Sequence, residues 1–233
     1  MVKPAFVAFA VISAATGLPG LHRAPQSGDW RAVSASYAAV RDYTALYEKE
    51  EQAISGGEPQ RMHLSFRRPL DVRLEWVDDS GKASQIAVYR EGHNGGRLLA
   101  RRSGVFGSLV GTVSLDPHDR RALADSRHPI TDVGIGHIIE SASQALAANG
   151  GIGRPVVEDT LDRQPAYRFE FVAPPPGLLF GIPGARRALV WVDRALMLPV
   201  SVEIVDERGA MLERHRFRDV HLNNGLTDSV FSL

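Results

Sequence analysis

The residues best suited to chemistry in this 233-residue sequence are its eight histidines and the carboxylates near them. The histidines occupy positions 22, 63, 93, 118, 128, 137, 215 and 221. No two of them are three to five residues apart, so local spacing supplies no pair of metal ligands on one turn of a helix. Histidines that come together only in the folded chain remain an open alternative.

Two short clusters combine a histidine with carboxylates. The segment Asp116-Pro117-His118-Asp119 could supply oxygen and nitrogen ligands, but Asp-Pro commonly opens a turn, and a turn with a solvated histidine is the favoured interpretation. His137 and Glu140 are one helical turn apart and could form an acid/base pair, although an ordinary surface contact is the simpler reading. We therefore predict no catalytic residue, no metal site and no cofactor.

Composition excludes several classes of protein. The absence of cysteine excludes disulfides, zinc ribbons, iron–sulfur clusters and thiol catalysis. The sequence also lacks three sequence motifs: the G-x-S-x-G motif of many hydrolases, the H-E-x-x-H motif of zinc proteases, and the glycine-rich loops that bind nucleotides. The 27 basic residues balance the 27 acidic residues, which argues against a partner that is a nucleic acid. A hydrophobic share of 44% is that of an ordinary globular protein.

The N-terminus has the composition of a secretory signal. Lys3 provides the positive charge, and the apolar run that follows ends in the small residues Ser13-Ala14-Ala15. The run is shorter than the roughly 20 apolar residues of a membrane span. We expect residues 1–15 to be a signal peptide, with cleavage as late as residue 24, although a buried N-terminal helix or strand is the alternative.

The mature protein is then expected to be periplasmic or otherwise exported. Residues 16–28 are rich in glycine, proline and serine and are expected to be flexible. No later apolar run approaches the length of a membrane span, so no transmembrane segment is expected. Residues 29–233 are expected to form a single domain, because no long linker divides the strand pattern.

Alternation of apolar and polar residues predicts a sheet. In residues 60–67, for example, Met62, Leu64 and Phe66 share one face. Strands are predicted at residues 44–52, 60–67, 71–77, 83–90, 97–102, 110–115, 154–161, 166–173, 188–193, 199–206 and 211–221. Helical spacing of apolar residues predicts one helix from Asp29 to about Tyr43 and a second from Thr131 to Ala148. The fold class is therefore mainly β (α+β).

A meander with this many strands must curl, and its helices can cover the concave face. Such an architecture encloses an apolar space.

Several separated motifs resemble an uncharacterised bacterial family, domain of unknown function 1571. The first lies in residues 88–100, Val-Tyr-Arg-Glu-Gly-His-Asn-Gly-Gly-Arg-Leu-Leu-Ala, and the next in residues 112–117 and 127–134. The C-terminal part contributes Trp191-Val192-Asp193 and residues 217–228. The likeness covers roughly residues 30–231, which is most of the chain.

This family resembles the periplasmic lipoprotein carriers of the LolA kind. The resemblance implies a half-open antiparallel β-barrel, here of about 10–11 strands, with helices covering the concave face and a cavity for acyl chains. Those carriers have an Arg-Pro pair after an early strand, and Arg67-Arg68-Pro69 is similar. The resemblance implies that Arg68 reaches the lid helices and holds their carbonyl ends.

The leading hypothesis is a non-catalytic protein that binds a lipid or an acylated protein in an apolar cavity and carries it through the periplasm. The predicted lining residues are Leu64, Phe66, Leu74, Trp76, Val88, Ile138 and Ile139, and plain core packing is the alternative for each. A second hypothesis is a module that recognises an envelope protein partner, or senses envelope state, around a filled core. A third is a hydrolase or isomerase with an unrecognised site.

Residues 174–184 are too long for a tight hairpin and predict a lid. Four large apolar side chains lie there between prolines and glycines: Leu178, Leu179, Phe180 and Ile182. If exposed, they would form a gate or a docking patch. The alternative is that the segment folds back onto the core.

Overall fold

The computed structural model describes residues 30–52, 58–78, 81–102, 111–148 and 154–233. The expected signal peptide, residues 1–15, and the expected flexible segment, residues 16–28, lie outside the described residues.

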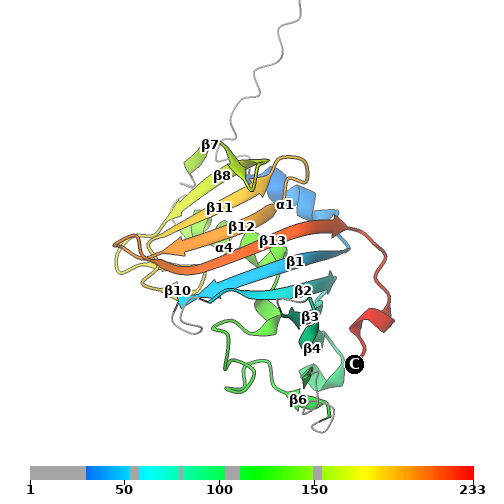
Figure 1. Cartoon of the computed structure of the whole chain (residues 1–233). Helices are drawn as coiled ribbons and strands as arrows, with labels where there is room; N and C mark the ends of the chain where they lie inside the picture. The colour runs from blue at the N-terminus through cyan, green and yellow to red at the C-terminus, as the bar shows by residue number, and fades with distance from the viewer. Residues whose placement is uncertain (1–29, 53–57, 79–80, 103–110, 149–153) are drawn as a thin grey trace, which may run out of the picture.

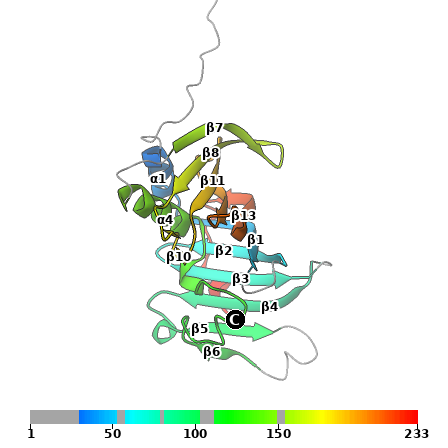
Figure 2. The ribbon, with the colours of Figure 1, turned by 90° about the vertical axis from the view of Figure 1, so that its left-hand side faces the viewer.

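One antiparallel sheet of 11 strands dominates the fold, in the order β6-β5-β4-β3-β2-β1-β13-β12-β11-β8-β7. An N-terminal meander supplies β1 (Asp42–Glu51), β2 (Gln60–Arg67), β3 (Asp71–Val77), β4 (Ala83–Arg90), β5 (Leu98–Arg102) and β6 (Val113–Leu115). A C-terminal meander supplies β7 (Arg154–Leu161), β8 (Gln164–Val172), β11 (Arg187–Asp193), β12 (Pro199–Val205) and β13 (Met211–Leu222). The sheet curls without closing, with β6 and β7 at its edges (Figure 2). The predicted mainly β, half-open fold is confirmed.

The two meanders meet where β1 pairs with β13. The pairing runs from Tyr43 opposite Leu222 to Glu51 opposite Glu213. The long β1 and β13 strands therefore form the middle of the sheet, although they lie near opposite ends of the described chain (Figure 1).

Two α-helices lie on the same side of the sheet (Figures 1 and 2). They are α1 (Trp30–Ala38) and α4 (Ile135–Ala148), with the short η3 (Ile130–Asp132) before α4. The indole Nε1 of Trp30 donates to Ser143 Oγ at 3.1 Å and joins the two helices. Helix α1 ends five residues before the predicted Tyr43, because the chain enters β1 at Asp42. Among the described helices, none has both the length and the apolar character that a bilayer crossing needs.

The start of α4 is fixed by a tyrosine from β1. The hydroxyl of the fully buried Tyr43 accepts a hydrogen bond from the Ile135 amide at 2.9 Å and so satisfies a free N–H of the first turn. Gly134 has φ +121°, and a Cβ there would lie 2.5 Å from the Tyr43 hydroxyl oxygen. Glycine at this position allows both the backbone conformation and the close approach.

A C-terminal segment covers part of the other face of the sheet. Its η4 (Asp228–Phe231) places Phe231, which is 3% exposed, against Ile86 and Val88 of β4. Asp228 accepts from Arg67 at 2.7 Å and holds the segment against β2.

The expected lid forms the small hairpin of β9 (Leu178–Leu179) and β10 (Ile182–Pro183). Leu179, Phe180 and Ile182 are 2%, 8% and 0% exposed, whereas Leu178 is 63% exposed. Of the two alternatives for this segment, folding back onto the core therefore holds for three of the four side chains, and a patch of all four on the surface is not formed. These three belong to the main core, where the ring of Phe180 lies 6.1 Å from that of Phe171 on β8, and this packing removes their apolar area from water.

Candidate functional site

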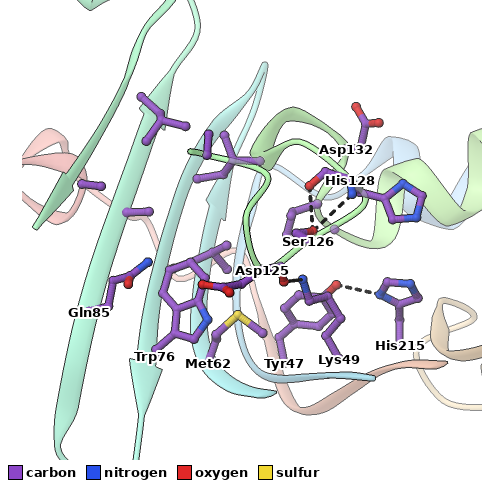
Figure 3. A pocket seen from close by; sticks show the side chains of 18 of the residues that line it. Tyr47, Lys49, Met62, Trp76, Gln85, Asp125, Ser126, His128, Asp132 and His215 are labelled. Atoms are coloured by element: carbon purple, nitrogen blue, oxygen red, sulfur yellow. Dashed lines mark hydrogen bonds between the residues drawn. The ribbon is translucent and has the colours of Figure 1, made fainter. Parts of the chain in front are cut away.

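A cavity of about 580 Å³ lies on the concave side of the sheet. Most of its wall is apolar, and the wall is formed by β1–β6, residues 121–134, α4, β12 and β13. Its lining includes Met62, Leu74, Trp76, Ala87, Leu98, Leu115, Ile130, Ile138, Phe180, Val202, Ile204 and Phe217. In Figure 3 His128 and His215 lie at one end and Gln85 at the other, with Met62 and Trp76 between them.

Buried charges hold the loop that carries His128 over this cavity. Glu51, at the end of β1, is 1% exposed and accepts from the Arg127 amide at 2.8 Å. Lys49, two residues earlier on the same face of β1, donates to the Asp125 carbonyl at 3.2 Å and lies 3.4 Å from Glu51. Ser126 Oγ donates to the His128 carbonyl at 2.8 Å. The loop is thereby fixed against the middle of the sheet.

Glu213 and the histidines form the ionisable end of the cavity. Glu213 is 0% exposed, and its Oε2 lies 2.8 Å from His128 Nε2 and 3.2 Å from His215 Nε2. Glu213 and His215 share a face because they are two residues apart on β13. The Tyr47 hydroxyl lies 2.7 Å from His215 Nδ1. Arg127 Nε lies 2.9 Å from the second Glu213 oxygen, as an ion pair rather than an aligned hydrogen bond.

These contacts shift the pKa values of the cluster. Burial raises the pKa of Glu213, but hydrogen bonds and charge from His128 and His215 outweigh it and lower the pKa to about 2. Burial lowers the pKa of His128, yet the hydrogen bond and charge of Glu213 raise it overall. Burial lowers the pKa of His137, the next histidine along the cavity wall. Glu213 is therefore anionic, and His137 is neutral, at neutral pH.

Two groups of three side chains bring their ligand atoms within 4.8 Å of one another in the described part of the chain. One contains His128, Glu213 and His215, and the other contains His128, Asp132 and His137. Local spacing did not predict either group. The i, i+2 spacing of Glu213 and His215 on a strand was the available signal, whereas His128 comes from a loop without periodicity.

The predicted lining residues fall into three places. Leu74, Trp76 and Ile138 line the cavity, as does Phe180 from the predicted lid. Leu64, Phe66 and Ile139 are buried in the main core and are not among the residues that line the cavity. Val88 lies on the opposite face of the sheet with Phe231.

Arg68 contacts the end of a helix. Its guanidinium donates to the Tyr37 carbonyl in the last turn of α1 at 2.8 Å and lies 4.5 Å from the centroid of the Tyr37 ring. Arg68 therefore joins β2 to α1, at a distance from the ionisable end of the cavity.

The two clusters noted in the sequence adopt ordinary local structure. Asp116 accepts from the His118 amide at 2.8 Å, which closes a turn with an exposed histidine. Glu140 accepts from Gln144 at 3.3 Å on the outer face of α4, while the ring of His137 faces that of His128 with centroids 6.2 Å apart.

The cavity combines an apolar wall with one charged end. Such a site can shelter an apolar chain, and its histidines and carboxylates can share protons or coordinate a cation. Exposed Arg101, Arg102 and Arg121 also belong to the lining.

Residues 40–233 match the family described as "Protein of unknown function (DUF1571)". The chain belongs to this family. The resemblance predicted from the sequence is thereby confirmed. No curated protein matches the sequence.

Solved structures with the same fold include MucB. That structure aligns with 89% of this chain and 62% of its own length, at 16% identity and a TM-score of 0.52. The MucA/MucB complex of Pseudomonas aeruginosa aligns with 89% of this chain and 60% of that chain, at 16% identity and a TM-score of 0.52. This chain thus spans about three fifths of the length of these structures. The Mycobacterium tuberculosis lipoprotein LppX aligns with 86% of this chain and 96% of that chain, at 10% identity and a TM-score of 0.48.

Proposed function

We propose that this protein is an exported, non-catalytic binder of an amphipathic ligand, a lipid or an acylated protein, whose acyl chain occupies the cavity. The observation that carries the proposal is the apolar cavity on the concave face of a half-open barrel. Its volume of about 580 Å³ lies within the usual range of small-molecule sites, roughly 300–1,000 Å³. Each CH₂ moved from water into such a wall contributes about 0.8 kcal/mol.

The position of charges favours an anionic head group. Arg101 and Arg102, at the end of β5, and Arg121 are exposed, while most of the apolar lining is buried. An acyl chain in the cavity would therefore leave its head group beside guanidinium groups, which bind phosphate and carboxylate oxygens in a fork. The Phe180 end of the β9–β10 hairpin would close the wall around the chain.

Fatty-acid binding tests this proposal, with a substitution that fills the cavity. Ala100 on β5 lines the cavity, and Ala83 on β4, also half-buried, is not among the lining residues. We expect Ala100→Trp to weaken binding of a fluorescent fatty acid at least tenfold, because the indole occupies the space of the acyl chain. Ala83→Trp is the matched control and should bind as the wild type does.

Native mass spectrometry of protein purified from its own host's cell envelope would identify the natural ligand. A co-purified lipid lost in Ala100→Trp supports the proposal. Equal binding of the probe by the wild type and by a folded Ala100→Trp variant contradicts it.

A second candidate function is recognition of a protein partner in the cell envelope. The fold likeness to MucB, solved in complex with MucA, favours it. In that case the cavity would remain empty in the purified protein, and the wild type would not take up the fatty-acid probe.

A further inference from the structure

The ionisable end of the cavity has the donor set of a transition-metal site. Two imidazole nitrogens and one carboxylate oxygen converge there from β13 and from the loop before η3. We propose that His128 Nε2, His215 Nε2 and Glu213 Oε2 bind a divalent transition-metal ion such as Zn²⁺, with the fourth position open to the cavity. This proposal does not depend on lipid binding.

The distances suit an ion of this size. Zn–N bonds of about 2.0–2.1 Å and Zn–O bonds of about 2.0–2.2 Å place tetrahedral ligand atoms about 3.3 Å apart. Glu213 Oε2 lies 2.8 Å from His128 Nε2 and 3.2 Å from His215 Nε2. An ion would replace the protons of these two contacts, and Oε2 would need to move only slightly away from each nitrogen. The three ligand atoms all lie within 4.8 Å of one another.

Glu213 supplies a fixed negative charge in a place that water does not reach. Its side chain is 0% exposed, and its second oxygen, Oε1, has no aligned hydrogen bond although Arg127 Nε lies 2.9 Å away. Arg127 contacts Oε1 and leaves Oε2 to face both histidines.

Tyr47 fixes the orientation of one ligand. Its hydroxyl lies 2.7 Å from His215 Nδ1, and its ring lies parallel to the imidazole, with an interplanar angle of 9°. An ion on Nε2 requires the proton of His215 to be on Nδ1, from which it is donated to the Tyr47 oxygen. Tyr47 is therefore a positioning residue for His215.

The donor chemistry selects the class of ion. Imidazole nitrogens with one carboxylate suit zinc and other late first-row ions, whereas Mg²⁺ and Ca²⁺ prefer six or more oxygen ligands. The adjacent group of His128, Asp132 and His137 offers a competing arrangement that uses the same His128. Variants of His137 and His215 distinguish the two arrangements.

The first measurement is Zn²⁺ binding by the chelator-treated wild-type protein, followed by calorimetric titration. We expect one Zn²⁺ per chain and no uptake of Mg²⁺ or Ca²⁺ under the same conditions. Failure of the folded wild type to bind Zn²⁺, or equal binding of Ca²⁺, would overturn the proposal.

The second measurement assigns the ligands. Tyr47→Phe removes the hydrogen-bond partner of the ligand His215 and should lower the affinity for Zn²⁺ by about 10–100-fold. His215→Ala and Glu213→Gln each remove a ligand and should lower the affinity further. His137→Ala and the exposed His63→Ala are controls and should bind as the wild type does. Loss of binding in His137→Ala with retention in His215→Ala would assign the ion to the other group and overturn the proposal.

Histidine-ring NMR of the wild type keeps the assignment testable if a variant fails to fold. With Zn²⁺, the Nε2 signals of two imidazoles should shift, and one of the two should be the ring bonded to the tyrosine hydroxyl. A spectrum in which no imidazole responds would overturn the proposal.

Discussion

The hydroxyl of Tyr43 on β1 accepts the first free amide of α4, that of Ile135, at 2.9 Å. Gly134 makes this contact possible, since a side chain there would lie 2.5 Å from the same oxygen. One tyrosine thus sets both where α4 begins and how it sits on the sheet.

A double-mutant cycle tests this arrangement. Tyr43→Phe should lower the free energy of unfolding by about 1–3 kcal/mol, because it leaves the buried Ile135 amide without an acceptor. Gly134→Ala should lower the free energy of unfolding by more than Tyr43→Phe does, because it adds a steric clash to an unfavourable φ. The two losses should be less than additive, since Tyr43→Phe removes the atom that the new Cβ would meet. Chemical denaturation of the four proteins measures the coupling, and strict additivity would contradict the explanation.

The network around Glu213 predicts an unusual dependence of stability on pH in the chelator-treated protein. Glu213 has a folded pKa of about 2 and an ordinary value of 4.5, so its contribution to stability is present above pH 4.5 and is lost as the pH falls toward 2. The pKa of His128 is raised above its ordinary value of 6.5 in the folded protein. Its contribution to stability is therefore complete below pH 6.5 and is lost as the pH rises through the pKa of the folded state. The charged or titratable groups around Glu213 are Lys49, Glu51, Arg127, His128 and His215.

The free energy of unfolding of the wild type should therefore exceed that of Glu213→Gln by the largest amount between pH 4.5 and pH 6.5. The difference should shrink on both sides of this window. Urea denaturation of both proteins across the pH range measures it, and a difference that is constant with pH would contradict the assigned charge states.

The β9–β10 hairpin predicts opposite outcomes for neighbouring leucines. Leu178→Ser should change stability by no more than about 0.5 kcal/mol, because this side chain is 63% exposed. Leu179→Ser should lower the melting temperature strongly, because Leu179 is 2% exposed in the main core. If the hairpin gates the cavity, Leu178→Ser should also alter the rate of fatty-acid uptake in a stable protein.

Calorimetry tests whether the two meanders unfold together. We expect a single cooperative transition for residues 29–233, because the β1–β13 pairing joins them in the middle of the sheet. A substitution in the seam, such as Phe217→Ala, should lower that transition without splitting it. Two separate transitions would show that the meanders are independent domains.

Periodicity predicted the strands well because most of them bury one face. Four strands, β2, β3, β4 and β7, have the predicted bounds. The first helix was predicted too long, since Tyr37 and Val40 continue its apolar spacing, but pairing of Tyr43 with Phe66 and Leu222 places Tyr43 in a strand. Tertiary contacts decided this boundary, and sequence alone does not contain them.

The candidate site was less predictable than the fold. Alternation identifies the apolar face of β3, and hence Leu74 and Trp76, as facing inward. It does not distinguish a cavity wall from a packed core, as Leu64 and Phe66 illustrate. His128 reaches Glu213 only through a loop that Glu51 and Lys49 anchor, and no local pattern reports contacts between residues that distant in sequence.

The β1–β13 seam also has a consequence for how the chain is made. The central pair of the sheet contains one of the first strands to leave the ribosome and the last. The N-terminal meander cannot complete its pairing until β13 has been synthesised, because β13 is the partner of β1. Pairings between residues so far apart in sequence form slowly, so the native sheet is expected to assemble late, after synthesis of the whole chain. An export pathway that threads unfolded chains would benefit from that delay.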